Sequence, residues 1–377
     1  MPTETVCVVI GTRPEAIKLA PVIRRLREDS RIARTTVLLT GQHREMVDQV
    51  MGHFGLHADR DLAIMQAGQS LAAITSRSLD GLERAFTEAR PALVIVQGDT
   101  TTAFAAALAA FYQEIAVAHV EAGLRTDDLR DPFPEELNRR LISQVATLHF
   151  APTERAVANL EAAGVPGRIF DTGNTVVDAL LETAATQPAC DVPGLDWDRH
   201  RTVLATIHRR ESWGDRIDAI ADALRSLLEQ YEDLAVVLPL HRNPTVREPL
   251  RAKLGDHPRA FLTEPLDYPQ LVGAMQRCYM LMTDSGGLQE EAPSLGKPVL
   301  VLRNTTERPE AIEAGTARLA GTATESIVTA ARELLDDAER YRAMATRANP
   351  FGDGRASERI VDHVWNFLAG RPGEMPG

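Results

Sequence analysis

Residues 6–21 read VCVVIGTRPEAIKLAP, an uncharged apolar run followed by a glycine and the start of an amphipathic segment. The run Val6–Ile10 is typical of a strand that is buried on both faces of a parallel sheet. Gly11 permits a tight turn, and Pro14 suits the first turn of a helix because its φ is already helical. A strand, a turn and a helix in this order predict the first unit of a doubly wound α/β domain.

The same alternation of short apolar runs and longer segments continues along the chain. The expected strands are at residues 6–10, 36–39, 92–96, 115–120, 148–151, 168–170, 202–207, 235–239, 260–263, 279–283 and 299–302. The expected helices are at residues 101–113, 135–145, 153–163, 217–230, 246–254, 269–277 and 324–335. Because buried strands alternate with amphipathic helices, we predict right-handed βαβ units and parallel sheets covered on both faces.

The length of the chain predicts two such domains. At roughly 150 residues per domain, 377 residues have room for two. A stretch at about residues 186–200 contains prolines and has the composition of a linker. We therefore expect two Rossmann-like, doubly wound domains that face each other across a cleft. Since such folds bind ligands at the carboxyl ends of their strands, the motifs at those ends matter most.

Composition excludes several classes of protein. Apolar residues make up 44% and charged residues 25%, which is globular, and a net charge of −12 is unsuited to nucleic acid. Three cysteines lie far apart, which argues against a disulfide scaffold or a cysteine-rich zinc site and fits a reducing compartment. The N-terminus has no basic segment of a signal peptide, and the longest apolar stretch, residues 103–112, is too short for a bilayer. We expect a cytoplasmic protein with no membrane partner.

Two strand–turn–helix junctions have residues that suit a diphosphate. Arg13 stands at the N-terminus of a helix, where free N–H groups attract an anion, although a capped helix with an exposed arginine has the same pattern. Ser285, Gly286 and Gly287 follow another predicted strand and expose backbone N–H groups in the same way. One turn later, Glu291 is placed to accept hydrogen bonds from a ribose diol. Helix capping alone explains the serine and glycines, whereas a nucleotide site also explains the glutamate.

Three acidic residues of the first half suit proton transfer. Asp99 and Glu121 follow predicted strands, and Glu135 opens a predicted helix. Asp99 also suits a helix N-cap and Glu135 a first helical turn, but a glutamate at the end of a buried central strand is seldom structural. Carboxylates that converge raise one another's pKa, which lets an acid and a base coexist at neutral pH.

His208 is the strongest histidine candidate. It ends the first strand of the second half and precedes Arg209 and Arg210, a combination that suits phosphate binding and proton transfer. The weaker candidates among the ten histidines are His43, His119 and His241. The sequence has no GxGxxG, P-loop or HExxH motif, which argues against a nicotinamide fingerprint, a P-loop nucleotide site and a zinc protease site.

Together these motifs resemble those of the non-hydrolysing bacterial UDP-N-acetylglucosamine 2-epimerases. The segments that carry the resemblance occur in order along the chain: GTRPEAIKLAP (11–21), GQHREMVDQV (41–50), GDTTT (98–102), HVEAGLRT (119–126), PEELNR (134–139), GNTVVDAL (173–180), HRRES (208–212), TDSGGLQEEAPSLGKPVL (283–300), TTERPE (305–310) and NPFGDG (349–354). Ten ordered motifs that extend over most of the chain make the resemblance specific.

The resemblance implies the GT-B fold, the two-Rossmann arrangement of one large class of glycosyltransferases, in which the last helix returns to the first domain. The first domain is then expected at residues 1–172 with a C-terminal helix at about 356–377, and the second at residues 173–355. The resemblance also implies a homodimer that needs no metal and no nicotinamide cofactor. Such enzymes interconvert UDP-N-acetylglucosamine and UDP-N-acetylmannosamine, a precursor of surface polysaccharides, by eliminating UDP to 2-acetamidoglucal and adding it back.

The resemblance also assigns roles to individual residues. The expected catalytic residues are Asp99, Glu121, Glu135 and His208. The residues expected to bind UDP or the substrate are Arg13, Lys18, His208, Arg210, Ser285, Gly286, Gly287 and Glu291. The positions that match a site for a second, activating UDP-N-acetylglucosamine are Gln42, Gln69, Glu136, Arg209 and His241, although these residues also suit the substrate cleft itself.

Four alternatives remain open from the sequence. A hydrolysing epimerase would release UDP and free N-acetylmannosamine, and a specialised epimerase would act on a modified UDP-hexosamine. A glycosyltransferase of the same fold needs an acceptor site rather than converging carboxylates. A non-catalytic sugar-nucleotide sensor would be expected to lack the carboxylates and the histidine that are present here.

Overall fold

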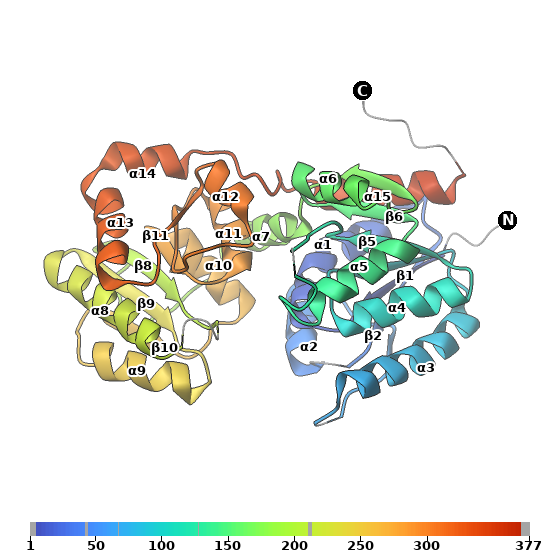
Figure 1. The fold of residues 1–377 in the computed structure, drawn as a ribbon, viewed down its shortest axis with the longest axis horizontal. Coiled ribbons are helices and arrows are strands. Elements are labelled where there is room, and N and C mark those ends of the chain that lie inside the picture. The colour runs from blue at the N-terminus through green and yellow to red at the C-terminus, as the bar shows by residue number, and fades with distance from the viewer. Residues whose placement is uncertain (1–4, 42–43, 67, 127, 210–212, 371–377) are drawn as a thin grey trace. The chain divides into compact units, whose positions relative to one another are not determined.

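The computed structural model describes residues 5–41, 44–66, 68–126, 128–209 and 213–370. These residues form two compact units, each built around its own parallel sheet (Figure 1). Unit 1 comprises Met1–Ala179 and Phe351–Gly377, and unit 2 comprises Leu180–Pro350. The boundaries therefore lie a few residues from those expected near 172 and 355, and the first falls inside helix α7 (Thr175–Ala185).

The sheet of unit 1 has the strand order β3-β2-β1-β4-β5-β6-β7, and all neighbouring strands are parallel. Its strands are β1 (Thr5–Ile10), β2 (Arg34–Leu39), β3 (Arg60–Asp61), β4 (Leu93–Gln97), β5 (Ala116–Val120), β6 (Leu148–Ala151) and β7 (Arg168–Asp171). The very short β3 is not among the predicted strands, because two charged residues have no apolar pattern.

Helices cover both faces of this sheet, as the apolar central strands predict. The helices of unit 1 are α1 (Arg13–Glu28), α2 (Arg44–His53), α3 (Leu71–Ala89), α4 (Thr101–Tyr112), α5 (Glu135–Val145), α6 (Glu154–Ala162), α15 (Ala356–Leu368) and the start of α7. Val8 and Ile10 of β1 pack in one core with α1, α2 and α15, whereas Cys7 and Val9 pack in another with α3, α4 and α5. Both cores are built on the alternation of side chains along one strand.

Unit 2 repeats this architecture with the parallel strand order β10-β9-β8-β11-β12-β13. Its strands are β8 (Arg201–Thr206), β9 (Leu234–Pro239), β10 (Ala260–Thr263), β11 (Met280–Thr283), β12 (Val299–Val301) and β13 (Ala317–Leu319). Its helices are α8 (Asp215–Gln230), α9 (Pro244–Leu254), α10 (Tyr268–Arg277), α11 (Gly286–Glu291), the 3₁₀ helix η2 (Ala292–Leu295), α12 (Pro309–Glu313), α13 (Thr324–Asp336) and α14 (Ala338–Ala345). Val203 of β8 and Met282 of β11 share an apolar core with α8, α9 and α13.

The stretch expected to be a linker, about residues 186–200, is packed within unit 2. Cys190 in this stretch is 3% exposed. Gly273 of α10 lies so close to the stretch that a Cβ added to this glycine would lie 2.4 Å from the Pro188 carbonyl oxygen. The stretch is therefore held against α10, an arrangement that its composition does not reveal.

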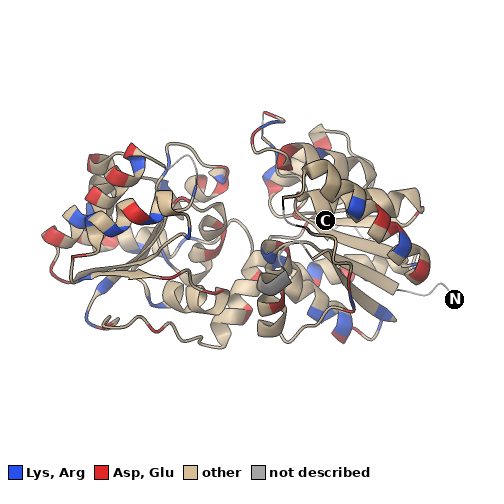
Figure 2. Cartoon of the chain, turned by 90° about the horizontal axis from the view of Figure 1, so that it is seen from below, with Lys and Arg blue, Asp and Glu red and all other residues tan. Residues whose placement is uncertain are grey.

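In both units the strand order reverses beside the first strand, between β1 and β4 in unit 1 and between β8 and β11 in unit 2. Doubly wound sheets bind ligands at the carboxyl ends of the strands at this point. Arg13, Asp99, His208 and Ser285 follow these four strands in that order, and Glu121 follows β5. Acidic and basic residues are otherwise interspersed over the helices of both units (Figure 2). Among the described residues, no helix combines the length and the apolar character needed to cross a membrane.

Candidate active site

A buried glutamate closes the turn between β1 and α1. The Glu15 carboxylate accepts hydrogen bonds from the backbone N–H groups of Gly11 (2.5 Å) and Thr12 (2.6 Å) and from the Thr100 hydroxyl after β4 (2.5 Å). Burial raises the pKa of Glu15 to about 7, although these hydrogen bonds oppose the rise. One side chain thus joins the loops that follow β1 and β4. Arg13, the first residue of α1, lies half-buried at this turn.

Glu121 lies directly after β5, and three side chains from other elements hold its carboxylate. Lys18 of α1 places its Nζ 2.6 Å from Glu121 Oε1, and Asn174 Nδ2 donates to the same oxygen at 3.3 Å. Gln97 Nε2, at the end of β4, donates to Oε2. The Glu121 backbone is left-handed, with a φ of 63°, which is uncommon for a residue other than glycine and is concentrated at functional sites. The structure therefore brings the predicted residues Lys18 and Glu121 together.

The other two predicted carboxylates lie in the same cluster. Asp99 follows β4, and Arg139 of α5 contacts its Oδ2 at 2.9 Å. Burial raises the pKa of Asp99, the Arg139 cation opposes the rise, and the carboxylates of Glu121 and Glu135 add to it. Glu135 is the first residue of α5 and is partly exposed. Three acidic groups from three elements therefore interact electrostatically in unit 1.

Helix α5 is anchored by Glu136, which is fully buried. The Glu136 carboxylate lies 2.6 Å from Arg140 Nε and 3.4 Å from Arg139 Nε, and it accepts a hydrogen bond from Thr126 N at 3.1 Å. Asn138 Nδ2, on the same helix, donates to the backbone carbonyl of Asp99 at 2.9 Å. These contacts hold Arg139 against Asp99, so Glu136, which was expected at an activator site, has a supporting role in unit 1.

His119 supports the turn that carries Asp99. It is fully buried on β5, and its Nε2 lies 2.7 Å from the Gly98 carbonyl oxygen. Burial lowers the pKa of His119 to about 3, so the ring is neutral at physiological pH and Nε2–H donates to this carbonyl. A neutral buried ring cannot bind a phosphate by its charge. His119 is thus part of the scaffold behind the carboxylates.

In unit 2, a buried aspartate organises the loop after β8. Asp284 follows β11 and accepts hydrogen bonds from His208 N (3.0 Å) and Arg209 N (2.9 Å). Its Oδ1 also lies 2.8 Å from His208 Nδ1, while the His208 side chain remains 45% exposed. Burial alone would raise the pKa of Asp284, but the His208 contacts and the backbone N–H groups lower it overall. Sequence reasoning identified His208 and missed Asp284, although the residue lies inside the TDSGG motif.

The predicted Ser-Gly-Gly turn starts helix α11. Ser285 is the residue before the helix and Gly286 and Gly287 are its first two residues. Glu291 ends α11, is 6% exposed, and accepts a hydrogen bond from the Tyr268 hydroxyl at 3.1 Å. This residue was expected to bind a ribose. Tyr268, which the sequence did not single out, orients its carboxylate.

Arg209 makes an ion pair within unit 2. Its guanidinium contacts the Glu307 carboxylate at 2.7 and 3.2 Å, and Arg303 lies 3.4 Å from the same group. Burial raises the pKa of Glu307, but the bond to Arg209 and the neighbouring cations lower it to about 2. A Cβ added to Gly286 would lie 3.5 Å from Arg209 Nη2, so the guanidinium lies beside the start of α11. Glu307 belongs to the TTERPE motif and was not predicted as a site residue.

Other predicted residues have local partners or lie outside the description. Gln69 binds within its own loop, because Oε1 accepts from Gln66 N (2.7 Å) and Nε2 donates to the Ile64 carbonyl (3.2 Å). His241 is exposed after β9, and its Nδ1 accepts from Asn243 N at 3.2 Å. The candidates outside the described residues are Gln42, His43 and Arg210.

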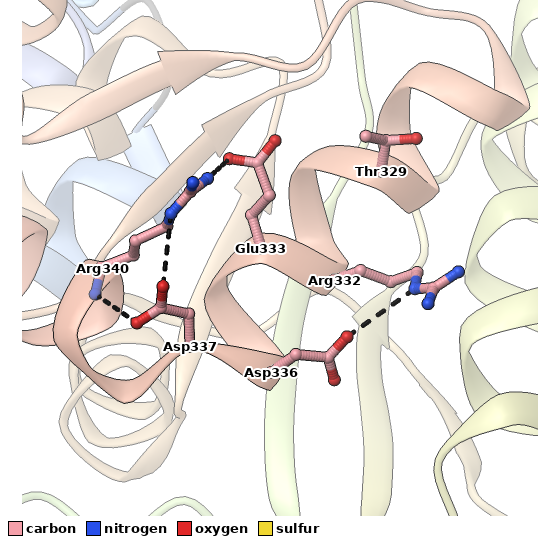
Figure 3. A pocket seen from close by; sticks show the side chains of 6 residues that line it. All are labelled: Thr329, Arg332, Glu333, Asp336, Asp337 and Arg340. Atoms are coloured by element: carbon pink, nitrogen blue, oxygen red, sulfur yellow. Dashed lines mark hydrogen bonds and ion pairs between the residues drawn. The ribbon is translucent and has the colours of Figure 1, made fainter.

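A surface hollow of unit 2 is lined by α13 and α14 and contains none of the predicted residues (Figure 3). Its lining residues are Thr329, Arg332, Glu333, Asp336, Asp337 and Arg340. Arg340 contacts Glu333 at 2.5 Å and Asp337 at 3.3 Å, so the charges of the hollow are paired with one another. Within the described part of the chain, no group of three or more His, Cys, Asp or Glu side chains is arranged to hold a metal ion.

Comparison with known proteins places this arrangement in a family. The sequence profile of the family described as UDP-N-acetylglucosamine 2-epimerase matches residues 24–364. The chain belongs to this family. It is 48% identical over 371 residues to the UDP-N-acetylglucosamine 2-epimerase of Escherichia coli K12, with 96% of this chain and 98% of that protein covered. It is also 48% identical over 363 residues to the Bacillus subtilis enzyme of the same name, covering 95% and 94% of the two chains.

Solved structures of the family share the fold. The UDP-GlcNAc 2-epimerase of Neisseria meningitidis, solved bound to UDP-GlcNAc, is 45% identical and superposes with a TM-score of 0.88 over 96% of this chain and 99% of that chain. The predicted fold class, two Rossmann-like α/β domains of the GT-B type, is thereby confirmed. As a member of an epimerase family, the chain is an isomerase.

Proposed function

We propose that the chain catalyses the reversible C2 epimerisation of UDP-N-acetylglucosamine to UDP-N-acetylmannosamine. In the proposed reaction a base removes the C2 proton while the C1–O bond to UDP breaks, which gives 2-acetamidoglucal and UDP. The UDP oxygen then adds back to C1, and a proton is delivered to the opposite face of C2. Atoms and charges balance without an oxidant, because nothing is lost or gained overall.

The observation that carries this proposal is the carboxylate cluster of unit 1. Proton transfer on two faces of one carbon needs two groups of different acidity, and interacting carboxylates in a partly desolvated site provide them. Asp99, Glu121 and Glu135 interact in this way, while Lys18 and Arg139 offset their charge. Two members of this cluster would therefore serve the two faces of C2.

Residues of unit 2 would supply most of the contacts to the UDP group. We assign this role to Arg13 of unit 1 and to His208, Arg210, Ser285, Gly286, Gly287 and Glu291. The support is that His208 follows β8 and the Ser285-Gly286-Gly287 turn follows β11, where the strand order reverses, together with the exposed side chain of His208. His208 would assist the departure of UDP by hydrogen bonding to its phosphate.

Further properties are proposed on the resemblance to the family. The protein would be a cytoplasmic homodimer that needs no metal or nicotinamide and supplies a polysaccharide precursor. A second UDP-N-acetylglucosamine would activate it through Gln42, Gln69, Glu136, Arg209 and His241. Since Glu136 already pairs with Arg140 and Arg139 pairs with Asp99, an activator at this position would act on the carboxylate cluster through α5.

The proposal is tested by incubating the protein with UDP-N-acetylglucosamine in D₂O and following the sugar by NMR. We expect deuterium at C2 and a UDP-N-acetylmannosamine signal with no free sugar, and the same result after treatment with EDTA. Free N-acetylmannosamine would instead identify a hydrolysing enzyme. The absence of exchange would refute the activity on this substrate, and modified UDP-hexosamines would then be tried.

A further inference from the structure

The buried carboxylate of Asp284 contacts the His208 ring and the backbone of the loop that carries it. Asp284 is 0% exposed, and it faces the loop that follows β8. Its Oδ2 accepts hydrogen bonds from the backbone N–H groups of His208 (3.0 Å) and Arg209 (2.9 Å), and its Oδ1 lies 2.8 Å from His208 Nδ1. The strand ends beneath it are tied by the Thr206 and Thr283 hydroxyls, whose oxygens are 2.5 Å apart. The position of the aspartate side chain is therefore fixed by its own hydrogen bonds and by the contact between the two strand ends.

This geometry fixes the position of a proton on the imidazole ring. An ionised carboxylate only accepts hydrogen bonds, so the His208 nitrogen that contacts Asp284 must carry the hydrogen. The lowered pKa of Asp284 keeps the carboxylate ionised at neutral pH. The ring is 45% exposed, and within the described residues no hydrogen bond engages its Nε2. The nitrogen that gains and loses a proton is therefore Nε2.

We propose that Asp284 is a positioning residue, which holds His208 as its Nδ1–H tautomer and aims Nε2 at the diphosphate of a nucleotide sugar. The inference rests on the proposed role of His208 in the departure of UDP. When the C1–O bond breaks, the Nε2–H of the imidazolium hydrogen bonds to the leaving phosphate oxygen or transfers its proton to it, and the neutral Nδ1–H form remains. On re-addition of UDP the proton returns to Nε2. Asp284 keeps its charge throughout and stabilises the imidazolium.

Substitution of Asp284 by asparagine should reverse the tautomer while preserving the shape of the side chain. The amide oxygen of the new side chain can still accept from the backbone N–H groups of His208 and Arg209, which turns its NH₂ group toward the ring. Nδ1 must then accept a hydrogen bond, and the proton moves to Nε2. Because positioned acid–base groups contribute about 10²–10⁴-fold to a rate, Asp284→Asn should lower kcat by about that factor and leave KM unchanged.

The direct test is ¹⁵N NMR of the ring nitrogens at mildly alkaline pH, in protein labelled at histidine, with the His208 signals identified by their loss in His208→Asn. The proposal predicts that Nδ1 of the wild-type protein is protonated and that Nε2 has the shift of an unprotonated nitrogen. The opposite pattern would overturn it. This readout needs no substrate and no variant of Asp284, so it remains decisive if Asp284→Asn fails to fold or if the epimerase activity itself is refuted.

A double-mutant cycle distinguishes a role of Asp284 in positioning His208 from a role in the stability of the fold. In a His208→Asn background, Asp284→Asn should cause no further loss of kcat, because the residue through which it acts is gone. A full additional loss in that background would contradict the proposal. Asp178→Asn is the matched control, since Asp178 is equally buried and accepts hydrogen bonds from Ala356 N (3.1 Å) and Ser357 N (2.8 Å) of α15 in unit 1. It should lower stability and leave kcat and the His208 tautomer as in the wild type.

Discussion

Replacing Lys18 by methionine should destabilise unit 1 by about 3 kcal/mol. Lys18 Nζ and Glu121 Oε1 are 2.6 Å apart, and their side chains are only 15% and 6% exposed. At an effective dielectric constant of roughly 20, the attraction at this distance is about 6 kcal/mol, of which desolvation cancels a part. Removing one partner of a buried pair costs about 3–5 kcal/mol, because the other charge stays buried. We expect the lower end, since Gln97 and Asn174 still donate to the carboxylate.

The assay is urea unfolding followed by the fluorescence of Trp365, which packs against the core of unit 1 on α15. The chain has three tryptophans, so Trp197→Phe and Trp213→Phe in all variants leave Trp365 as the only reporter. Combining Lys18→Met with Glu121→Gln should cost less than the sum of the single changes, because the pair is then removed together.

The matched control for this prediction is Arg60→Met. Arg60 contacts Glu88 at 2.5 Å in the same unit, but their side chains are 43% and 63% exposed. An exposed pair contributes about 0–1 kcal/mol, so this variant should barely change the free energy of unfolding. If Lys18→Met and Arg60→Met had the same small effect, the Lys18–Glu121 contact would be no more than a surface pair, and the reasoning would be refuted.

Three further changes can be followed with the same Trp365 reporter. The folded-state pKa of His119 is about 3, against an ordinary 6.5, so its neutral ring stabilises unit 1 fully above pH 6.5. This contribution falls by up to about 1.4 kcal/mol per pH unit as the pH drops toward 3. His119→Asn should flatten the dependence of unfolding free energy on pH in this range, and an unchanged slope would contradict the burial argument. Glu15 acts in the opposite sense, since its pKa is raised from 4.5 to about 7 and its stabilising effect is lost as pH rises through this range, so Glu15→Gln should remove a decline at neutral pH. Asp178→Asn should cost about 2 kcal/mol, because Ala356 N and Ser357 N bond to different oxygens of the carboxylate and an amide keeps only one of them as an acceptor. A wild-type unfolding curve would show that Asp178 does not help to hold α15.

The sequence predicts most of the fold because the central strands, such as β4, β6 and β11, are buried on both faces and contain no Asp, Glu, Lys or Arg. β6 and β10 begin and end at the predicted residues, and α5 does also. The very short edge strands β3 and β13 were missed, since two or three residues carry no period. The packing of residues 186–200 against α10 was missed because it depends on a contact between Pro188 and Gly273, far apart in the sequence.

Some residues of the candidate site were predictable from the sequence and others were not. Asp99, Glu121 and His208 were predictable because a polar residue at the end of a buried strand marks the ligand-binding edge of the sheet. Their partners were not, because Gln97, Asn174 and Asp284 reach them through the tertiary fold. Glu15 lies in the first turn of α1, where an acidic residue is common, and only the folded chain shows that it also joins the loop after β4.

The central claim, that Glu121 takes part in proton transfer at C2, is tested most directly by Glu121→Gln with UDP-N-acetylglucosamine in D₂O. Gln keeps the size of the side chain and removes its charge and basicity. NMR should show no deuterium at C2, while calorimetry shows UDP binding as in the wild type and Trp365 fluorescence shows a folded unit 1. Exchange at the wild-type rate in this variant would contradict the account.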